Sequence, residues 1–262
     1  MSEGSYSKLK AFWNRIGHSF SSLYDAPSTG YYLECEKGLF EQHFPDLRGK
    51  RVFKTDLWDE AKNTRILKWA AEQGAEVYGL DISRRILSEA CLLFDKHNLG
   101  RKFVVSDLRD IAFGDGSFDY LYSMGTIEHF PEYTRALKEC FRVMRRKGLA
   151  VFGVPNKLDP FLRPLMVTVL NRLGLYAYGY EKSFSMRQLE EMLTHAGFEV
   201  IGKTGILFMP GWLRMADLFF HVHRPRITAL TSPLISLFRF FYRKFPSLRP
   251  HGYLIACYVR KP

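Results

Sequence analysis

The spacing of apolar residues changes along the chain, and the predicted secondary structure changes with it. Over 9–23 and 31–44, apolar residues recur at helical spacing, and the turn-forming run 25–30 separates the two segments. From residue 51 onward, short apolar runs alternate with longer amphipathic segments. The short runs predict strands at 51–55, 76–80, 102–105, 118–122, 149–154, 198–207 and 253–259. The longer segments predict helices at 63–73, 84–97, 133–146 and 185–196.

Strands that alternate with helices indicate a parallel sheet covered by helices on both faces, with ligands bound at the carboxyl ends of the strands. Two apolar segments interrupt the alternation, 155–184 and 209–252, and each is too long for an ordinary loop. We expect residues 49–262 to form one domain in which these two segments are insertions. Residues 1–48 are expected to form a helical lid.

Composition places the chain among ordinary globular proteins. Its 262 residues are enough for a large core, and 47% hydrophobic with 25% charged residues argue against disorder and against a polytopic membrane protein. The four cysteines form no CxxC pair and no cluster with histidine, so the sequence predicts neither a metal site nor a disulfide framework. They are Cys35, Cys91, Cys140 and Cys257. A reducing, cytoplasmic compartment fits this pattern.

Positive charge is concentrated in the C-terminal part of the chain. From residue 205 onward there are nine Lys or Arg, among them Arg239, Arg243 and Lys244, and one acid. They alternate with aliphatic and aromatic residues, which is typical of segments that contact anionic membrane surfaces rather than nucleic acid. A packed helical cap with solvated arginines accounts equally for the pattern. The longest uncharged stretch there, 227–238, is too short to span a bilayer, and residues 1–10 carry no secretory signal.

Acidic residues end two of the predicted strands. Asp81 closes the second strand, and Asp107 follows the third. A carboxylate at a strand tip can accept hydrogen bonds from both hydroxyls of a ribose, as in α/β domains that bind nucleosides. Taken alone, Asp81 is better explained as the N-cap of the helix that begins near Arg84. The second acid and the segment 113–121 make the nucleoside interpretation more specific.

The order of these elements resembles the class I S-adenosylmethionine-dependent methyltransferases, in particular the group called methyltransferase type 11. The resemblance covers 49–207 and the closing strand. It rests on the runs AEVYGLDIS, VVSDLRDIAFGDGSFDYLYSMGTIEHF, ALKECFRVMRRKGLAVFGVP and SFSMRQLEEMLTHAGFEV. It implies a doubly wound, mostly parallel seven-stranded sheet of the Rossmann-like kind with helical insertions. It also implies S-adenosylmethionine as cofactor and methyl transfer as the reaction.

The resemblance assigns cofactor contacts to the strand ends. Asp81, with Ile82 beside it, would hold the ribose hydroxyls. Asp107 with Leu108 would frame the adenine. The cofactor would therefore lie across the carboxyl ends of the second and third strands.

Further site residues are expected after the fourth strand. By the resemblance, Ser123 and Met124 line the cofactor near the transferable methyl group. His129, preceded by Glu128, is a candidate general base for an acceptor hydroxyl because histidine titrates near neutral pH. The pair is also common at this place in the family, where it would orient the loop over the cofactor. Because the sulfonium is already an activated leaving group, methyl transfer depends mainly on positioning and needs no metal.

One stretch departs from the family pattern. In family members the first strand is usually followed by an acidic residue and a glycine-rich loop, whose backbone amides can come close to the cofactor. In this chain, residues 51–73 contain no glycine. We expect Thr55 and Asp56 to bind the methionine end of the cofactor, with Asp59 and Glu60 as further carboxylates for its ammonium group. Two alternatives stay open: these acids only cap a helix, or the chain is a catalytically silent, methyltransferase-like binding module.

The two insertions would open on the cofactor face, and both are rich in Leu, Phe, Tyr and Pro. The expected acceptor is therefore apolar, a lipid or lipid-linked molecule at the inner face of a membrane. Tyr24, Tyr31 and Tyr32 of the lid either close over the cofactor or pack in the core. The alternative is a soluble methyltransferase for a small aromatic, quinone or sugar acceptor. Nucleic acid is disfavoured because 123–126 lacks the Asn/Asp-Pro-Pro-Tyr run of base-methylating enzymes.

Overall fold

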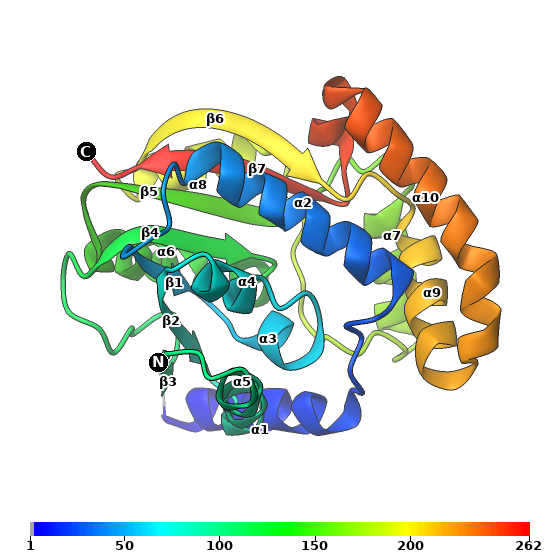
Figure 1. Ribbon diagram of the computed structural model, residues 1–262, viewed down its shortest axis with the longest axis horizontal. Helices are drawn as coiled ribbons and strands as arrows, with labels where there is room; N and C mark the ends of the chain where they lie inside the picture. Colours follow the sequence, from blue (N-terminus) through cyan, green and yellow to red (C-terminus); the bar gives the residue numbers. More distant parts are fainter. Residues whose placement is uncertain (1–2) are drawn as a thin grey trace.

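The computed structural model describes residues 3–262, with side chains described from residue 7 onward, and its strands form a single sheet (Figure 1). The first two residues of the expected lid lie outside this range. The strands are β1 (Arg51–Lys54), β2 (Glu76–Asp81), β3 (Lys102–Val105), β4 (Phe118–Met124), β5 (Met144–Pro155), β6 (Glu199–Ile206) and β7 (Leu254–Arg260). Their order is β3-β2-β1-β4-β5-β7-β6, and only the pairs made by β7 are antiparallel within this sheet. This is the doubly wound, mostly parallel seven-stranded sheet expected from the sequence.

The order of strands reverses between β1 and β4. The chain runs outward from β1 to β3 and then returns to place β4 on the other side of β1, with Phe53 opposite Leu121. Connections that leave neighbouring strands in opposite directions open a crevice at their carboxyl ends. The residues that follow β1, β2 and β4 therefore meet at one edge of the sheet.

Helices cover both faces of the sheet, and the sheet separates two apolar cores. These helices are α2 (Pro27–His43), α4 (Ile66–Glu72), α5 (Arg84–Lys96), α6 (Tyr133–Val143) and α8 (Met186–His195). The helices α2, α4 and α5 share one core with Val52 and Tyr122. The helices α6 and α8 share the other with Phe53 and Leu121. Because successive strand residues point to opposite faces, β1 and β4 contribute to both cores.

The insertions add helices beside the carboxyl ends of the strands. They form α7 (Arg163–Arg172), α9 (Gly211–His223) and α10 (Thr228–Lys244), with 3-10 turns at Pro225–Ile227 and Pro246–His251. Figure 1 shows α9 and α10 at the edge of the molecule toward which β4 and β6 point. At another edge, α1 (Glu3–Ser19) lies along α5, where the Ser83 hydroxyl donates to the Asn14 side chain at 2.9 Å. No helix in the described part of the chain is both long and apolar enough to cross a membrane.

Several elements differ from the sequence expectation, and three of the differences concern where helices form. The helix α2 begins at Pro27, inside the run expected to break the chain, because proline is well suited to the first turn of a helix. A short helix, α3 (Trp58–Lys62), forms where a loop was expected. The helix α6 ends three residues before residue 146, because Met144 pairs with Phe118 and begins β5.

Candidate active site

A cavity of about 430 Å³ opens at the carboxyl ends of β1, β2 and β4, a volume typical of small-molecule sites. Ten of the twelve expected site residues line it: Thr55, Asp56, Asp59, Asp81, Ile82, Asp107, Leu108, Met124, Glu128 and His129. Glu60 is buried beside the cavity and does not line it. Ser123 does not line it. Its side chain is fully buried behind the wall, with its hydroxyl 2.9 Å from that of Thr55. The fold thus brings the expected residues together, and Ser123 can act only through Thr55.

The loop after β1 contains a buried ion cluster in place of glycines. The Lys54 ammonium is fully buried, 2.9 Å from both Asp56 and Asp59 and 3.7 Å from Glu60. Burial alone would lower the pKa of Lys54, but these three carboxyl groups raise it well above its usual value. Burial raises the pKa of Glu60 to about 7, although Lys54 opposes the shift. Three carboxyl groups surround one cation. This end of the cavity therefore either carries net negative charge or has carboxyl groups that are protonated.

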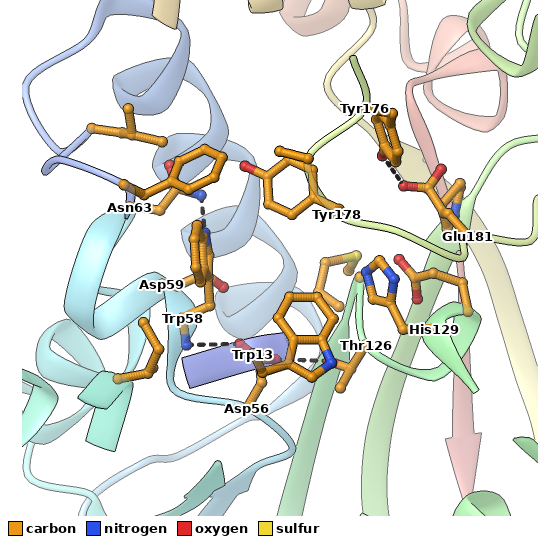
Figure 2. A pocket seen from close by; sticks show the side chains of 18 of the residues that line it. Trp13, Asp56, Trp58, Asp59, Asn63, Thr126, His129, Tyr176, Tyr178 and Glu181 are labelled. Atoms are coloured by element: carbon orange, nitrogen blue, oxygen red, sulfur yellow. Dashed lines mark hydrogen bonds between the residues drawn. The ribbon is translucent and has the colours of Figure 1, made fainter. Parts of the chain in front are cut away.

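Hydrogen-bond donors fix the carboxylates of this loop where it faces the cavity (Figure 2). Asp56 accepts from the Thr126 hydroxyl at 2.7 Å and from the Trp58 backbone N–H at 3.1 Å. Asp59 accepts from the Asn63 side-chain amide at 2.8 Å. These acids therefore do more than cap a helix, because they form a rigid set of oxygen acceptors suited to a cation.

The acids that end β2 and β3 have different partners. Asp81 accepts from the backbone N–H groups of Leu57, at 3.1 Å, and Ser83, at 2.8 Å. Burial raises the pKa of Asp81 to about 7, against the opposing effect of these donors. The N-cap of α5 is Ser83 and not Asp81. Asp107 is held by the Arg109 guanidinium through both oxygens, at 2.9 and 2.7 Å, so it reaches the cavity as part of an ion pair.

His129 and Glu128 line the cavity, and burial disfavours the charged form of both side chains. The Nδ1 atom of His129 lies 2.8 Å from the Tyr180 carbonyl oxygen, which can only accept, so Nδ1 carries the proton and Nε2 is an acceptor. Burial lowers the pKa of His129, which keeps the ring neutral near pH 7. Burial and the nearby Glu181 raise the pKa of Glu128 well above its usual value. The Oε2 atom of Glu128 has no hydrogen-bond partner among the described residues.

Aromatic side chains that were not expected in the site from the sequence also line the cavity (Figure 2). Trp13 of α1 meets His129 edge-on, with ring centroids 5.1 Å apart. The Phe20 ring lies 5.2 Å from that of Trp58 and 5.3 Å from that of Tyr178. These rings come from three distant segments, and only Tyr178 lies in an insertion that the sequence marks as rich in aromatic residues.

The three tyrosines considered for the lid lie in different places. Tyr32 lines the cavity. The Tyr24 ring lies under the Arg65 guanidinium, 3.8 Å from it. Tyr31 is buried in the core, with its ring 5.7 Å from that of Tyr242. Only Tyr32 of these three is positioned to contact a bound molecule.

A buried ion pair lies in the wall opposite the strand ends. Arg163 contacts the Glu181 carboxylate at 2.6 and 3.0 Å, and the Tyr176 hydroxyl donates to the same carboxylate. Burial alone would raise the pKa of Glu181, but Arg163 lowers it below its usual value. The Arg163 guanidinium also lies over the Tyr253 ring, 4.3 Å from its centroid. The two charges are 18 residues apart in an insertion, and no local motif marks them.

The rest of the wall formed by the insertions is largely apolar, apart from Arg214 and His223. Its apolar residues include Met166, Val167, Leu175, Met215, Leu218, Phe219 and Val222. Leu175 and Phe219 are 67% and 57% exposed, so the rim of the cavity presents hydrocarbon to the outside. The cavity lining includes no residue of α10 among those described. That helix lies against α2, where Arg239 and Arg243 form ion pairs with Glu34.

Residues 61–152 match the family model described as a methyltransferase domain. The chain is 31% identical over 172 residues to a demethylmenaquinone methyltransferase of Thermotoga maritima, covering 59% of this chain and 70% of the relative. It is 31% identical over 139 residues to a 2-methyl-6-phytyl-1,4-hydroquinone methyltransferase of Synechocystis, covering 53% of this chain. The chain spans only 39% of the length of that second relative.

Among solved structures, a magnesium protoporphyrin IX methyltransferase from Synechocystis with bound SAH has the same fold. The TM-score is 0.59 over 98% of this chain and 95% of that one, at 14% sequence identity. The likeness extends over the whole sheet and its flanking helices, so the common part of the two proteins is the fold itself.

Proposed function

The chain belongs to the class I S-adenosylmethionine-dependent methyltransferases, and we propose that its methyl acceptor is an amphiphile with a long apolar part, taken from a membrane surface. The cofactor is S-adenosylmethionine, and the reaction is transfer of its methyl group. The observation that carries the proposal is the exposed apolar rim formed by Leu175 and Phe219 at the mouth of the cavity. Exposed hydrocarbon at a binding site is favourable where the site faces lipid.

We assign the cofactor to the strand-end half of the cavity, meaning residues 54–63 with Asp81 and Asp107. The rest of its wall includes Ile82, Leu108 and Met124. Asp81 is suited to the ribose, because two backbone donors fix its carboxylate at the cavity wall. Asp56 and Asp59 are suited to the methionine end, because their negative charge attracts its ammonium and sulfonium groups. When bound, the cofactor supplies a methyl group on an activated sulfur.

We assign the acceptor to the insertion half, meaning α7, residues 175–181 and α9. Its polar head would meet His129, whose Nε2 atom can take a proton from an acceptor hydroxyl as the methyl group arrives. Trp13 and Tyr180 fix the orientation of that ring. Burial favours the protonated form of Glu128, and in that form its carboxyl group can donate a hydrogen bond to an acceptor oxygen.

Further observations support an acceptor taken from a membrane. Exposed apolar residues continue from the rim along α7 and its flanks, with Leu162, Leu165 and Leu173 between 58% and 65% exposed. The Synechocystis relative is named for an acceptor with a phytyl chain. Positive side chains flank the rim, since Arg172 precedes the exposed leucines of 173–175 and Arg224 and Arg226 follow α9; all three are exposed. A basic border around an apolar surface favours anionic lipid.

The test is flotation of the purified protein with vesicles of phosphatidylcholine and phosphatidylglycerol at low salt. The wild-type protein should float with the vesicles, and the double variant Leu175→Asp/Phe219→Asp should lose at least four-fifths of the bound fraction. Leu92→Asp is the matched control, because Leu92 is 67% exposed on α5, outside the proposed surface. Arg239 and Arg243 are unsuitable for this test, because their ion pairs with Glu34 attach α10 to α2.

Calorimetric titration with S-adenosylmethionine shows whether each variant keeps its cofactor site. If the wild-type protein binds cofactor but stays free of vesicles, the membrane part of the proposal is wrong. Turnover of a water-soluble quinol or aromatic acceptor by that protein would then favour the soluble alternative.

A further inference from the structure

Arg214 brings a buried positive charge to the wall of the insertion half. It lies near the start of α9, is 8% exposed and lines the cavity. Its Nη1 atom donates to the Ser28 carbonyl oxygen at 3.2 Å, and its guanidinium lies over the Tyr32 ring, 5.0 Å from the centroid. Both partners are uncharged. No carboxylate in the described part of the chain forms an ion pair with Arg214.

The charged groups next to Arg214 have other partners. Arg163, the cation at the start of the neighbouring α7, is paired with Glu181. Asp217, one turn further along α9, accepts hydrogen bonds from a backbone N–H at 2.9 Å and from the Thr231 hydroxyl at 2.6 Å. These donors do not balance the negative charge of Asp217, because both are uncharged, but Asp217 forms no ion pair with Arg214. A buried guanidinium that no carboxylate contacts is costly. A guanidinium left in this state in a cavity wall indicates that the bound molecule supplies the anion.

Arg214 stands at one end of an apolar stripe along α9. Leu218 and Val222 follow it at intervals of four residues and line the same wall, because such positions share a helix face. Arg214 is buried, whereas Leu218 and Val222 are half-buried and Phe219 at the rim is 57% exposed. The wall therefore leads from an exposed apolar rim to a buried cation. This gradient matches an amphiphile that enters with an acidic head first.

We propose that Arg214 binds an anionic oxygen group, a carboxylate or a phenolate, on the polar head of the methyl acceptor. The proposal rests on the proposed function, because it specifies the head group of the same amphiphilic acceptor. The planar fork of donors on a guanidinium is suited to such a group, and Ser28 and Tyr32 leave most of those donors free to bind it. The carboxylate of S-adenosylmethionine has the same chemistry, so the experiment must separate the two sources.

The experiment compares decanoate with 1-decanol as probes of equal chain length. Each is titrated into the protein saturated with S-adenosylhomocysteine, and binding is followed by the fluorescence of the tryptophans that line the cavity, Trp13 and Trp58. Affinity for S-adenosylmethionine is measured separately by calorimetry. The variants are Arg214→Gln, which removes the charge, and Arg214→Lys, which keeps it. Arg146→Gln is the control, because Arg146 is exposed and does not line the cavity.

We expect the wild-type protein and the control to bind decanoate at least tenfold more tightly than 1-decanol. Arg214→Gln should reduce this preference to less than twofold while leaving the affinity for S-adenosylmethionine unchanged, and Arg214→Lys should keep part of the preference. Equal binding of the two probes by the wild-type protein would overturn the proposal. A tenfold loss of S-adenosylmethionine affinity in Arg214→Gln, with the decanoate preference intact, would assign Arg214 to the cofactor instead. A wild-type protein that binds no cofactor would contradict the proposed function itself.

Discussion

In the strand-end half of the cavity, donors hold the carboxylates in place, whereas the wall of the insertion half consists largely of hydrocarbon side chains that only pack. Lys54 holds Asp56 and Asp59, and two backbone amides hold Asp81. Across the cavity, α7 and α9 contribute aliphatic and aromatic groups, several of them exposed at the rim. In the strand-end half the carboxylates are fixed in position, whereas the surface of the insertion half is mainly apolar and adaptable.

This difference has an energetic consequence. Removing one member of a buried ion cluster leaves an uncompensated charge, whereas removing an apolar contact costs an amount that scales with the lost area. The strand-end half should therefore respond sharply to single substitutions. Apart from its buried Arg163–Glu181 ion pair, the insertion half should respond in small steps, which allows its shape to follow the acceptor.

The largest effect is expected from Lys54→Met. This change leaves three buried carboxyl groups without their cation, which predicts a loss of about 3–5 kcal/mol in the free energy of unfolding at pH 8. Lys54 opposes the rise in the pKa of Glu60, so without it these acids bind protons more readily in the folded state. The loss should therefore shrink as the pH falls from 8 to 5. Urea denaturation measures both quantities.

The control for this prediction is Lys96→Met, because Lys96 is exposed at the end of α5. Its effect should stay below about 0.5 kcal/mol. A loss below about 1 kcal/mol in Lys54→Met would mean that the cluster contributes little to stability.

The second effect concerns cofactor affinity. Asp81→Ala removes an acceptor for two ribose hydroxyls, and charge-assisted hydrogen bonds of about 1.5–3 kcal/mol each predict at least a ~100-fold weaker binding of S-adenosylmethionine by calorimetry. Asp110→Ala, an exposed acid outside the cavity lining, is the control. The pKa of Asp81 is raised to about 7, and the ionised form is the better acceptor. Wild-type affinity should therefore fall as the pH drops below 7, by up to about tenfold per pH unit.

The contribution of Asp81 to that pH dependence can be isolated, because Glu60 titrates in the same range. In Asp81→Ala the pH dependence should be reduced. An affinity within threefold of the wild type would exclude Asp81 from the ribose site.

The third effect concerns the proposed base. His129→Asn should lower kcat about 100-fold with the calorimetric affinity for S-adenosylmethionine unchanged, because general base catalysis contributes roughly this much. Burial lowers the pKa of His129, so the wild-type rate should fall on acidification only below pH 6.5, and the variant should lack this dependence. His18→Asn, exposed on α1, is the control. A loss of kcat below threefold would leave His129 with the loop-orienting role.

The smallest effect is expected where an insertion attaches to α2. Glu34→Gln removes a carboxylate that pairs with Arg239 and Arg243, both of which are substantially exposed. Because exposed ion pairs contribute about 0.2–1 kcal/mol, the free energy of unfolding should change by less than about 1 kcal/mol. Thermal denaturation at low and high salt measures this change, which should disappear at high salt. A loss as large as that of Lys54→Met would mean that this exposed contact contributes as much to stability as the buried Lys54 cluster.

The strand-end site could be read from the sequence to a large extent. Asp81 and Asp107 were identified because each ends or follows a strand, and the carboxyl ends of neighbouring parallel strands share one edge. Met124 was assigned through the resemblance to the family. Ser123 precedes Met124 in the same strand and therefore points to the opposite face, behind the cavity wall. The sequence located the end of this strand. The alternation of side chains along the strand decided that Met124, and not Ser123, faces the cavity.

The insertion half could not be read in this way. Arg163 and Glu181 are 18 residues apart, and Arg214 contacts Ser28 across 186 residues. No periodic pattern relates such positions, so no local signal marks them. The role suggested for Arg239 and Arg243 at a membrane is not supported, because their charges face Glu34 on another helix.

The sequence by itself determined the alternation of strands and helices and the acids at the strand ends, because these depend on spacings within a few residues. The order of the elements and the four matching runs indicated the family. Only the tertiary structure decided how the glycine-free loop is held, through the buried Lys54 cluster, and which insertion residues face the cavity. Those outcomes depend on burial and on partners from distant segments. Burial sets both the cost of a charge and its protonation, and burial exists only once the chain is folded.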